Sequence, residues 1–168
     1  MSPPYILFFM SAPKQTGIKI ICENRKARFD YEILEKYEAG IMLVGSEVKS
    51  LRAGHVNLGD AYGMINGTGA YLVHAHISPY QQTAQYLNHE PLRTRKLLLH
   101  SAEIQKLLGK TQEKGLTLVP LKMYFKDGRA KVELALGKSK KKGDKRESIK
   151  KRDQDREVRR AFKGNHKK

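Results

Sequence analysis

The chain has 168 residues, enough for one domain with a core and a terminal extension. It carries 33 Lys and Arg against 17 Asp and Glu, so its formal net charge at pH 7 is +16. This excess favours a polyanionic partner, either nucleic acid or an anionic membrane surface. The single cysteine, Cys22, excludes an internal disulfide and a cysteine-rich zinc site, and it fits a reducing cytoplasm.

Residues 1–17 form a predicted N-terminal extension. Their apolar run, from Tyr5 to Met10, is shorter than the core of a signal peptide, and no positive region precedes it. We therefore expect this stretch to be disordered, and Met10 offers an alternative translation start. No later segment approaches the length of a membrane-spanning helix, so we expect no membrane partner.

Strand patterns dominate the body of the chain, residues 18–137. Phe29, Tyr31 and Ile33 alternate with acidic residues in the sequence RFDYEI. This alternation predicts a half-buried strand that directly follows a cluster of basic residues.

Two hairpins are predicted further along. The first joins residues 60–65 to 70–77 across an Asn-Gly-Thr-Gly turn. One face of its second strand is expected to be apolar: Tyr71, Val73, Ala75 and Ile77. The second hairpin joins residues 119–125 to 132–136 across Asp127-Gly128, because Asp-Gly tolerates the positive φ angles of a two-residue turn.

The sequence SEVKSLRAG predicts a short helix that begins after Ser46 as its N-cap. Val48 and Leu51 are three residues apart, so they share a face and would pack on the core. Lys49 and Arg52 share the neighbouring edge. The anchored helix would therefore hold two cations in fixed positions.

A second helix is predicted after Ser101, with Ile104, Leu107 and Leu108 as its apolar stripe. It follows a long exposed loop over residues 78–96 and a short apolar strand. Short strands, hairpin turns and small helices together favour a mainly β fold, an oligonucleotide-binding-type antiparallel β-barrel.

The composition changes in residues 138–168, which we call the tail. Ten Lys and five Arg stand against five acids there, so the tail carries +10 of the net charge. Its few apolar residues cannot bury enough surface to offset the entropy of ordering, so we expect disorder in isolation. Acids and bases four residues apart, such as Glu147 and Lys151, favour a helix that forms when a polyanion is bound.

No catalytic site is predicted. His74 and His76 would share a strand face, but no carboxylate or thiol stands at metal-ligand spacing, and surface histidines are the simpler interpretation. Glu38 and Glu47 are interpreted as exposed or salt-bridged acids. Neither a phosphate-binding glycine loop nor a nucleophile motif is present. We therefore expect no enzyme activity, metal or cofactor.

Three basic clusters remain to be explained: Arg25, Lys26 and Arg28; Lys49 and Arg52; Arg93, Arg95 and Lys96. They fit either three separately solvated groups or one concave patch for RNA phosphates. In the second interpretation, Asn24 and His100 would contact bases or ribose.

Four stretches, in this order and spacing, resemble the small protein B family, the SsrA-binding proteins of bacterial trans-translation: NRKARFDYEI, YEAGIMLVGSEVKSLRAGHVNLGDAY, RTRKLLLH and DKRESIKKRD. The likeness runs from about Asn24 to Asn165. It implies a six-stranded oligonucleotide-binding-type barrel with small helices and a flexible tail.

The resemblance also implies a function. Members bind the tRNA-like domain of transfer-messenger RNA and stand in for its missing anticodon arm. With elongation factor Tu they deliver the alanyl-charged RNA to ribosomes stalled on messages without a stop codon. The tail then enters the empty decoding site and message channel and becomes helical there. The protein performs no covalent chemistry, and we expect a cytoplasmic monomer.

Residue by residue, the resemblance places RNA contacts at Asn24, Glu38 and Leu98, with Glu38 holding local structure or accepting a hydrogen bond. Basic positions of the same motifs are matched by Lys49, Arg52, Arg95 and Lys96. The decoding-site element and the helix after it are matched by Asp144, Lys145, Arg146, Ile149, Lys150, Lys151 and Arg152. A later basic–hydrophobic pair lies near Arg160 and Phe162.

Some positions depart from the family pattern. His100 stands where Asn is frequent, Ser46 and Gln154 stand where Trp is frequent, and Ala161 interrupts the late pair. The missing tail aromatic puts a stacking contact in doubt. Two other functions stay open from the sequence. One is a ribosomal or general RNA-binding protein, and the other is an RNA-processing enzyme that uses the two histidines near the middle of the chain.

Overall fold

The computed structural model describes residues 17–141 except 68, 83 and 114, and in the tail only residues 143, 149, 153, 154 and 156. The strands of this part are β1 (Ile18–Glu23), β2 (Tyr31–Ile41), β3 (Val56–Asn57), β4 (Tyr62–Asn66), β5 (Gly69–Val73), β6 (His76–Ile77), β7 (Arg95–Leu98), β8 (Leu116–Lys126) and β9 (Arg129–Ser139). Its helices are α1 (Arg25–Asp30), α2 (Gly45–Arg52), α3 (Ser101–Thr111) and the 3₁₀ turn η1 (Gln85–Leu87).

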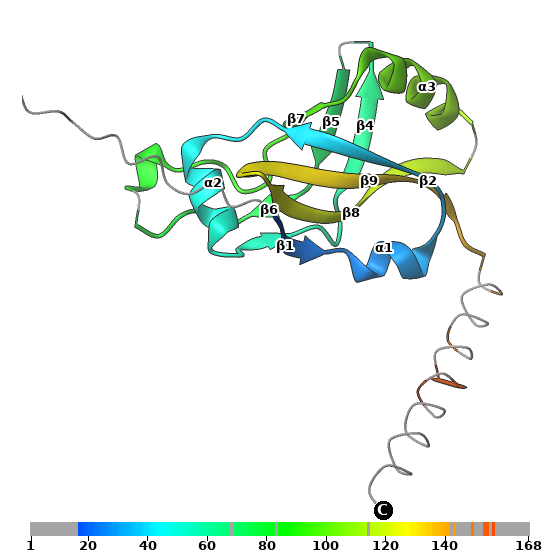
Figure 1. The fold of residues 1–168 in the computed structure, drawn as a ribbon, viewed down its shortest axis with the longest axis horizontal. Helices are drawn as coiled ribbons and strands as arrows, with labels where there is room; N and C mark the ends of the chain where they lie inside the picture. The colour runs from blue at the N-terminus through cyan, green and yellow to red at the C-terminus, as the bar shows by residue number, and fades with distance from the viewer. Residues whose placement is uncertain are drawn as a thin grey trace, which may run out of the picture.

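Six antiparallel strands close into a ring in the order β8-β4-β5-β7-β2-β9, because β8 also pairs with β9. β1 adds to the side of β8, and β3 pairs with β6 in a separate two-stranded sheet. The predicted oligonucleotide-binding-type barrel is therefore confirmed (Figure 1). The Asp-Gly hairpin is confirmed as well, since Lys126 pairs with Arg129 and both turn residues have positive φ.

The barrel interior is filled by aliphatic side chains that alternate along the strands. Leu72, Leu118 and Leu134 have no exposed surface. Leu51 of α2 and Leu107 of α3 belong to the same core cluster, so the two helices are anchored through one leucine each. Figure 1 shows α2 and α3 on opposite sides of the barrel.

The basic sequence after Glu23 folds as helix α1, not as the lead into a strand. The predicted strand around Phe29 is therefore wrong in its first part, since β2 begins only at Tyr31. Asn24 caps the helix by accepting a hydrogen bond from the Ala27 N–H at 3.0 Å. Ala27 is buried against the outer face of the β8–β9 hairpin, which holds this short helix in place.

The strand after the first hairpin turn changes face at His74, whose φ is +57°. Before this residue Ala70 and Leu72 are buried, and after it Ala75 and Ile77 are buried. The prediction of one continuous apolar face was therefore wrong for Tyr71 and Val73, which are only partly buried. His74 and His76 also lie on no common strand, because β5 ends at Val73 and β6 begins at His76.

Both longer helices begin earlier than predicted. The N-cap of α2 is Val44 instead of Ser46, and that of α3 is His100 instead of Ser101. In each case a glutamate three residues later accepts a hydrogen bond from the N-cap N–H, at 2.9 Å in α2 and 3.0 Å in α3. Carboxylate capping in the first turn thus replaces the predicted hydroxyl caps.

The loop after β6 is shorter and better packed than the sequence suggested. β7 begins at Arg95, so the predicted loop over residues 78–96 loses its last two residues to a strand. His89 within the loop is only 9% exposed. Among the described residues, no helix is long and apolar enough to cross a membrane.

Candidate nucleic-acid interface

A hollow of about 580 Å³ opens beside the exposed side of β7, which we call the hairpin hollow. Strands β2 and β7 line it together with the tip of the β8–β9 hairpin. Side chains suited to nucleic-acid contact line it: Glu38, Leu98, His100, Phe125, Arg129 and Lys131. Three of them, Glu38, Leu98 and His100, were predicted as RNA contacts, and the fold brings them together.

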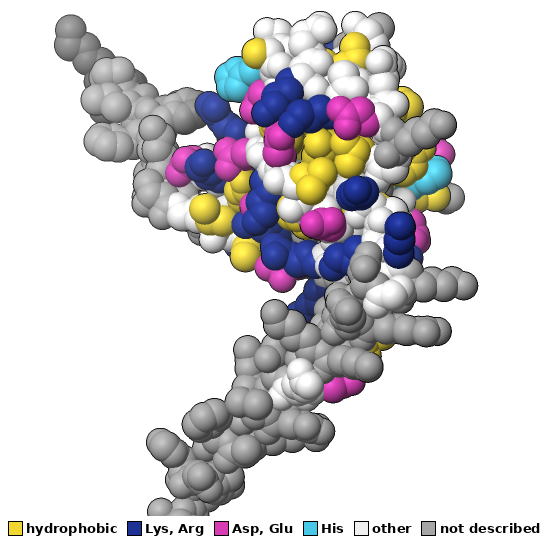
Figure 2. All heavy atoms as spheres, turned by 90° about the vertical axis from the view of Figure 1, so that its right-hand side faces the viewer, with side chains coloured by type: hydrophobic (Ala, Val, Ile, Leu, Met, Phe, Trp, Pro, Cys, Tyr) yellow, Lys and Arg dark blue, Asp and Glu magenta, His cyan; other side chains and the backbone are white. Residues whose placement is uncertain are grey.

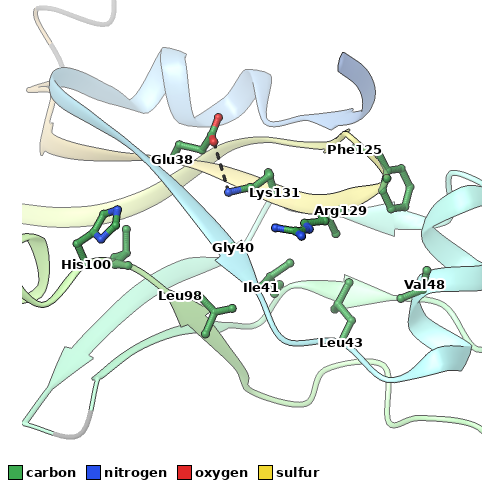
Figure 3. Close-up of a pocket in the computed structure, with 13 residues that line it drawn as sticks. Glu38, Gly40, Ile41, Leu43, Val48, Leu98, His100, Phe125, Arg129 and Lys131 are labelled. Carbon is green, nitrogen blue, oxygen red and sulfur yellow. Dashed lines mark ion pairs between the residues drawn. The ribbon is translucent and has the colours of Figure 1, made fainter. Parts of the chain in front are cut away.

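Figure 3 shows how the walls of the hollow differ. Arg129 and Lys131 lie between the carboxylate of Glu38 and the ring of Phe125, while Leu98 and Ile41 lie across from them. One wall is therefore charged and the other is apolar. Such a site can take both a phosphate and the face of a base.

Glu38 is held by three groups of the hairpin. The Tyr124 hydroxyl donates to its Oε2 atom, and Lys126 and Lys131 place their Nζ atoms 3.2 and 3.4 Å from Oε1. The hydrogen bond from Tyr124 is the main cause that lowers the pKa of the Glu38 carboxyl, with the lysines adding to it. The carboxylate is thus ionised and fixes the lysines, as expected for a residue that organises local structure.

Strand β7 sends its side chains alternately inward and outward. Arg95 and Leu97 are buried, whereas Lys96 and Leu98 are exposed, Leu98 by 53%. Lys96 and Leu98 therefore share the outer face of this strand. This strand therefore exposes an aliphatic side chain beside a cation.

Arg95 is a correction to the predicted RNA-binding set, because it has no exposed surface. Its Nε atom donates to Glu47 Oε1 at 2.7 Å, and its Nη atoms donate to backbone carbonyls that include those of Ala75 and Pro91. The guanidinium thus donates its hydrogen bonds to groups within the protein. Arg95 therefore supports the barrel and does not reach a ligand in this structure.

Glu47 is the partner of two arginines and is fully buried. Arg93 also binds it, with its Nη2 atom 2.6 Å from Oε2. Burial by itself would raise the pKa of the Glu47 carboxyl, but hydrogen bonds from Arg93, from the Val44 N–H and from Arg95 outweigh it and leave the pKa lowered. This cluster ties α2 to the segment before β7.

A second hollow, of about 450 Å³, lies beside α1 and is lined by other residues, among them Lys26, Asp60 and Tyr62. Arg25, Lys26 and Arg28 are exposed on α1, and Lys26 forms an ion pair with Asp60 at 3.2 Å. The two hollows share no lining residue. The α1 cations thus form a group of their own.

Asn24, predicted as an RNA contact, is only 5% exposed. Its Oδ1 atom caps α1, and its Nδ2 atom donates to the Leu58 carbonyl at 2.8 Å. Both polar atoms of the amide are therefore used within the protein. Asn24 thus positions α1 and its cations, and it also lines the second hollow.

Lys49 and Arg52 are exposed on α2, as predicted, while Leu51 of the same helix is buried. Val48 is only half-buried, and it lines the hairpin hollow. Neither cation forms an ion pair with an acid within the described part of the chain. The anchored helix therefore presents two cations that no described acid neutralises.

Sequence reasoning missed the three hairpin residues of the hollow, Phe125, Arg129 and Lys131. A signal was available, because the Asp-Gly turn places the residues around it at the tip of the hairpin.

Of the predicted tail residues, only Ile149 is described; it is helical and 46% exposed. The rest lie outside the described residues: Asp144, Lys145, Arg146, Lys150, Lys151, Arg152, Arg160 and Phe162.

Figure 2 shows Lys and Arg side chains gathered over the lower part of the barrel, on the side where the tail begins. Acidic side chains are interspersed among them. The surface is thus basic but divided, which agrees with separate cationic groups better than with one continuous patch.

Comparison with known proteins gives a consistent result. A family model described as SmpB protein matches residues 21–164. The chain is 58% identical over 150 residues to the SsrA-binding protein of Nostoc punctiforme, covering 89% of this chain and 97% of that protein. It is 57% identical over 147 residues to the SsrA-binding protein of Synechococcus elongatus, covering 88% and 96%.

The fold is likewise similar to a solved chain described as "tmRNA-SmpB: a journey to the center of the bacterial ribosome". The TM-score is 0.62 and the sequence identity 51%, and the likeness covers 76% of this chain and 93% of that one. The family match spans most of the chain, and close relatives are covered almost in full. The chain therefore belongs to the SmpB protein family.

Proposed function

We propose that this protein binds transfer-messenger RNA and acts with it on stalled ribosomes in trans-translation. The observation that carries this is the identity of more than half of the aligned residues to SsrA-binding proteins that the chain matches over nearly their whole length. The hairpin hollow and the exposed cations around it supply a surface of fitting chemistry.

The geometry divides the proposed RNA-binding residues into two roles. Those with exposed side chains contact the tRNA-like domain: Arg25, Lys26, Arg28, Lys49, Arg52, Lys96, Leu98 and His100. Those engaged within the protein position the others: Asn24, Glu38, Arg93 and Arg95. Cations that hold phosphates fix the register of the RNA, and Leu98 and His100 lie where a base or ribose can be read.

The tail supplies the ribosomal part of the function. Residues 138–168 carry a net charge of +10 and enter the decoding site and message channel, where ribosomal RNA is the polyanion. The decoding-site element comprises Asp144, Lys145 and Arg146, and the helix after it includes Ile149, Lys150, Lys151 and Arg152. Further along, Arg160 and Phe162 form the late pair.

The protein acts in the cytoplasm as a monomer, and elongation factor Tu joins through the charged RNA. The proposed role requires binding and positioning only, so no residue is assigned to covalent chemistry. RNA pairing and ribosomal catalysis supply the chemistry of rescue, and this chain supplies shape and charge.

The proposal is tested by purifying the affinity-tagged protein from its native cells in moderate salt and sequencing the RNA that accompanies it. A single abundant RNA with a tRNA-like end and a short reading frame is expected. A broad mixture dominated by ribosomal RNA would identify a general RNA-binding protein instead.

A further inference from the structure

The loop between β6 and β7 displays an aromatic side chain at its tip. Tyr86 is 85% exposed, the most exposed large apolar side chain among the described residues, and its neighbour Leu87 is 63% exposed. Both belong to the 3₁₀ turn η1. Covering two adjacent apolar side chains with a partner would be favourable, because it removes apolar surface from water.

The base of this loop is closed by one side chain. The Tyr80 N–H donates to Asn88 Oδ1 at 3.0 Å, and Asn88 Nδ2 donates back to the Tyr80 carbonyl at 2.9 Å. Within the loop the Leu87 N–H donates to the Ala84 carbonyl at 2.9 Å. The tip therefore belongs to a loop whose two ends are held together by hydrogen bonds.

His89 ties the loop to α2. Its Nε2 atom donates to the Ile77 carbonyl at 3.0 Å, which leaves Nδ1 as the acceptor for the Ser46 hydroxyl at 2.9 Å. Ser46 is the helix residue that differs from the common family pattern, and here it serves this contact. The loop and the helix thus form one continuous surface.

The α2 side of that surface carries two cations. Lys49 places its Nζ atom 5.7 Å from the centroid of the Tyr80 ring, a cation–π contact. Arg52 is exposed one helical turn further on. Glu47, the one acid of α2, is buried and paired with two arginines, so it does not neutralise the exposed cations.

We propose that this α2–loop surface, formed by Lys49, Arg52, Tyr80, Tyr86 and Leu87, binds an unpaired RNA segment. A base stacks on the Tyr86 ring, and the cations of α2 hold the adjoining phosphates. Aromatic side chains flanked by cations are the usual means of binding unstacked bases. The inference rests on the proposed function and adds a stacking residue to it.

The test compares Tyr86→Ala with Tyr86→Phe in the full-length protein. Loss of base stacking is expected to weaken RNA binding about tenfold in Tyr86→Ala, whereas Tyr86→Phe retains wild-type affinity. Two probes are used. One is a transcript of the tRNA-like domain, and the other is stalled ribosomes to which the protein binds together with its RNA. Because Tyr86 is exposed, both variants should unfold at the wild-type temperature.

The two RNA sources are separated by crosslinking. A benzophenone is attached to Leu87→Cys in a Cys22→Ser background, and the crosslinked molecule is identified. An adduct with the tRNA-like RNA or with ribosomal RNA supports the inference and says which RNA is bound. An adduct with a ribosomal protein alone, or wild-type affinity of Tyr86→Ala for both probes, would overturn it. If the wild type itself bound no transcript, the proposed function would fail instead.

Discussion

At the scale of single residues, β7 gives two neighbouring cations opposite roles. Arg95 is directed inward and has no exposed surface, while Lys96 is directed outward. A buried guanidinium is tolerated only when it is paired, and Glu47 supplies the pairing charge at 2.7 Å. Both residues are basic, so residue type alone does not show which of them can contact RNA.

Arg95→Met is expected to destabilise the protein strongly, because it leaves the buried Glu47 with one arginine fewer. Removal of one partner from a buried ion pair costs about 3–5 kcal/mol, and Arg93 retains part of the pairing here. The free energy of unfolding in urea measures the effect.

Lys96→Met, on the adjacent exposed position, is the matched control. It should leave the unfolding free energy within about 0.5 kcal/mol of wild type and should weaken RNA binding instead. Equal stability of the two variants would show that the buried pair contributes nothing to the fold.

At the scale of elements, α3 is held to β2 by a cluster around Glu35. Lys110 and the Tyr37 hydroxyl donate hydrogen bonds to its carboxylate, and Lys106 Nζ lies 2.9 Å from Oε2. These contacts, that of Lys110 foremost, lower the pKa of Glu35 from 4.5 to about 2. The helix that precedes β8 is therefore fixed by charge as well as by Leu107.

This cluster predicts a pH dependence of stability. Because the pKa of Glu35 is lowered in the folded state, the ionised carboxyl contributes stability above pH 4.5, and this contribution is lost as the pH falls through about 2. Wild type should thus be more stable than Glu35→Gln at pH 6, and the difference should shrink between pH 4.5 and 2. Urea unfolding over this range measures it, with Glu32→Gln as the control for net charge.

Helix α2 separates anchoring from binding. The double variant Lys49→Ala, Arg52→Ala should weaken binding to the tRNA-like RNA and lower the slope of log K against log salt by about 2, since each lysine or arginine on a phosphate contributes about one. Its melting temperature should stay unchanged because both side chains are exposed. RNA titrations at several salt concentrations and thermal unfolding measure the two effects.

Leu51→Ala supplies the opposite pattern for the same helix. Leu51 is 1% exposed, and truncation of a buried leucine costs about 2–5 kcal/mol. A double cation variant that melted as early as Leu51→Ala would contradict the division of roles.

What the sequence predicted well are features set by neighbouring residues. The hairpin across Asp127-Gly128 follows from two turn residues and regular alternation, and β8 and β9 pair as expected. In the other hairpin, the change of the buried face at His74 could not be predicted. A single residue with positive φ switches which side chains are buried without changing the alternation of residue types. α1 was missed because six residues are too few to distinguish helical spacing from alternation, although an N-cap asparagine preceded them.

The candidate site was predictable only in part for a related reason. Leu98 and His100, predicted as RNA contacts from their motif, are exposed and both line the hairpin hollow. The burial of Arg95 depends on Glu47, which is 48 residues away in the chain. Pairing over such a distance is a property of the closed barrel and leaves no local mark in the sequence.

At the scale of the whole molecule, the charge is divided between a folded body and a basic tail. The tail holds +10 of the +16 net charge in fewer than a fifth of the residues. The body buries an aliphatic core and carries cations on rigid elements, whereas the tail has few apolar residues. Under the proposed function, the body would bind the structured RNA and the tail would bind within the ribosome.

The boundary between these parts is set by the contacts of the last strand. β9 runs to Ser139, two residues past the predicted boundary, and the Lys140 N–H donates to the Asp30 carbonyl at 3.0 Å. Lys140 Nζ also lies 3.3 Å from the Arg28 carbonyl. A truncated protein that keeps the body intact must therefore retain all residues up to Lys141.

Removal of residues 142–168 is predicted to separate RNA binding from ribosome rescue. The truncated protein should melt at the wild-type temperature and still bind the tRNA-like transcript, because the barrel and its exposed cations remain. It should fail to release ribosomes stalled on a message without a stop codon, as measured by tagging of the nascent chain in a reconstituted translation system. A variant whose residues 142–168 are shuffled keeps the charge, and it should fail as well if the order of the tail residues matters. Rescue by the shuffled tail would reduce the role of the tail to charge alone, and rescue by the truncated protein would remove that role altogether.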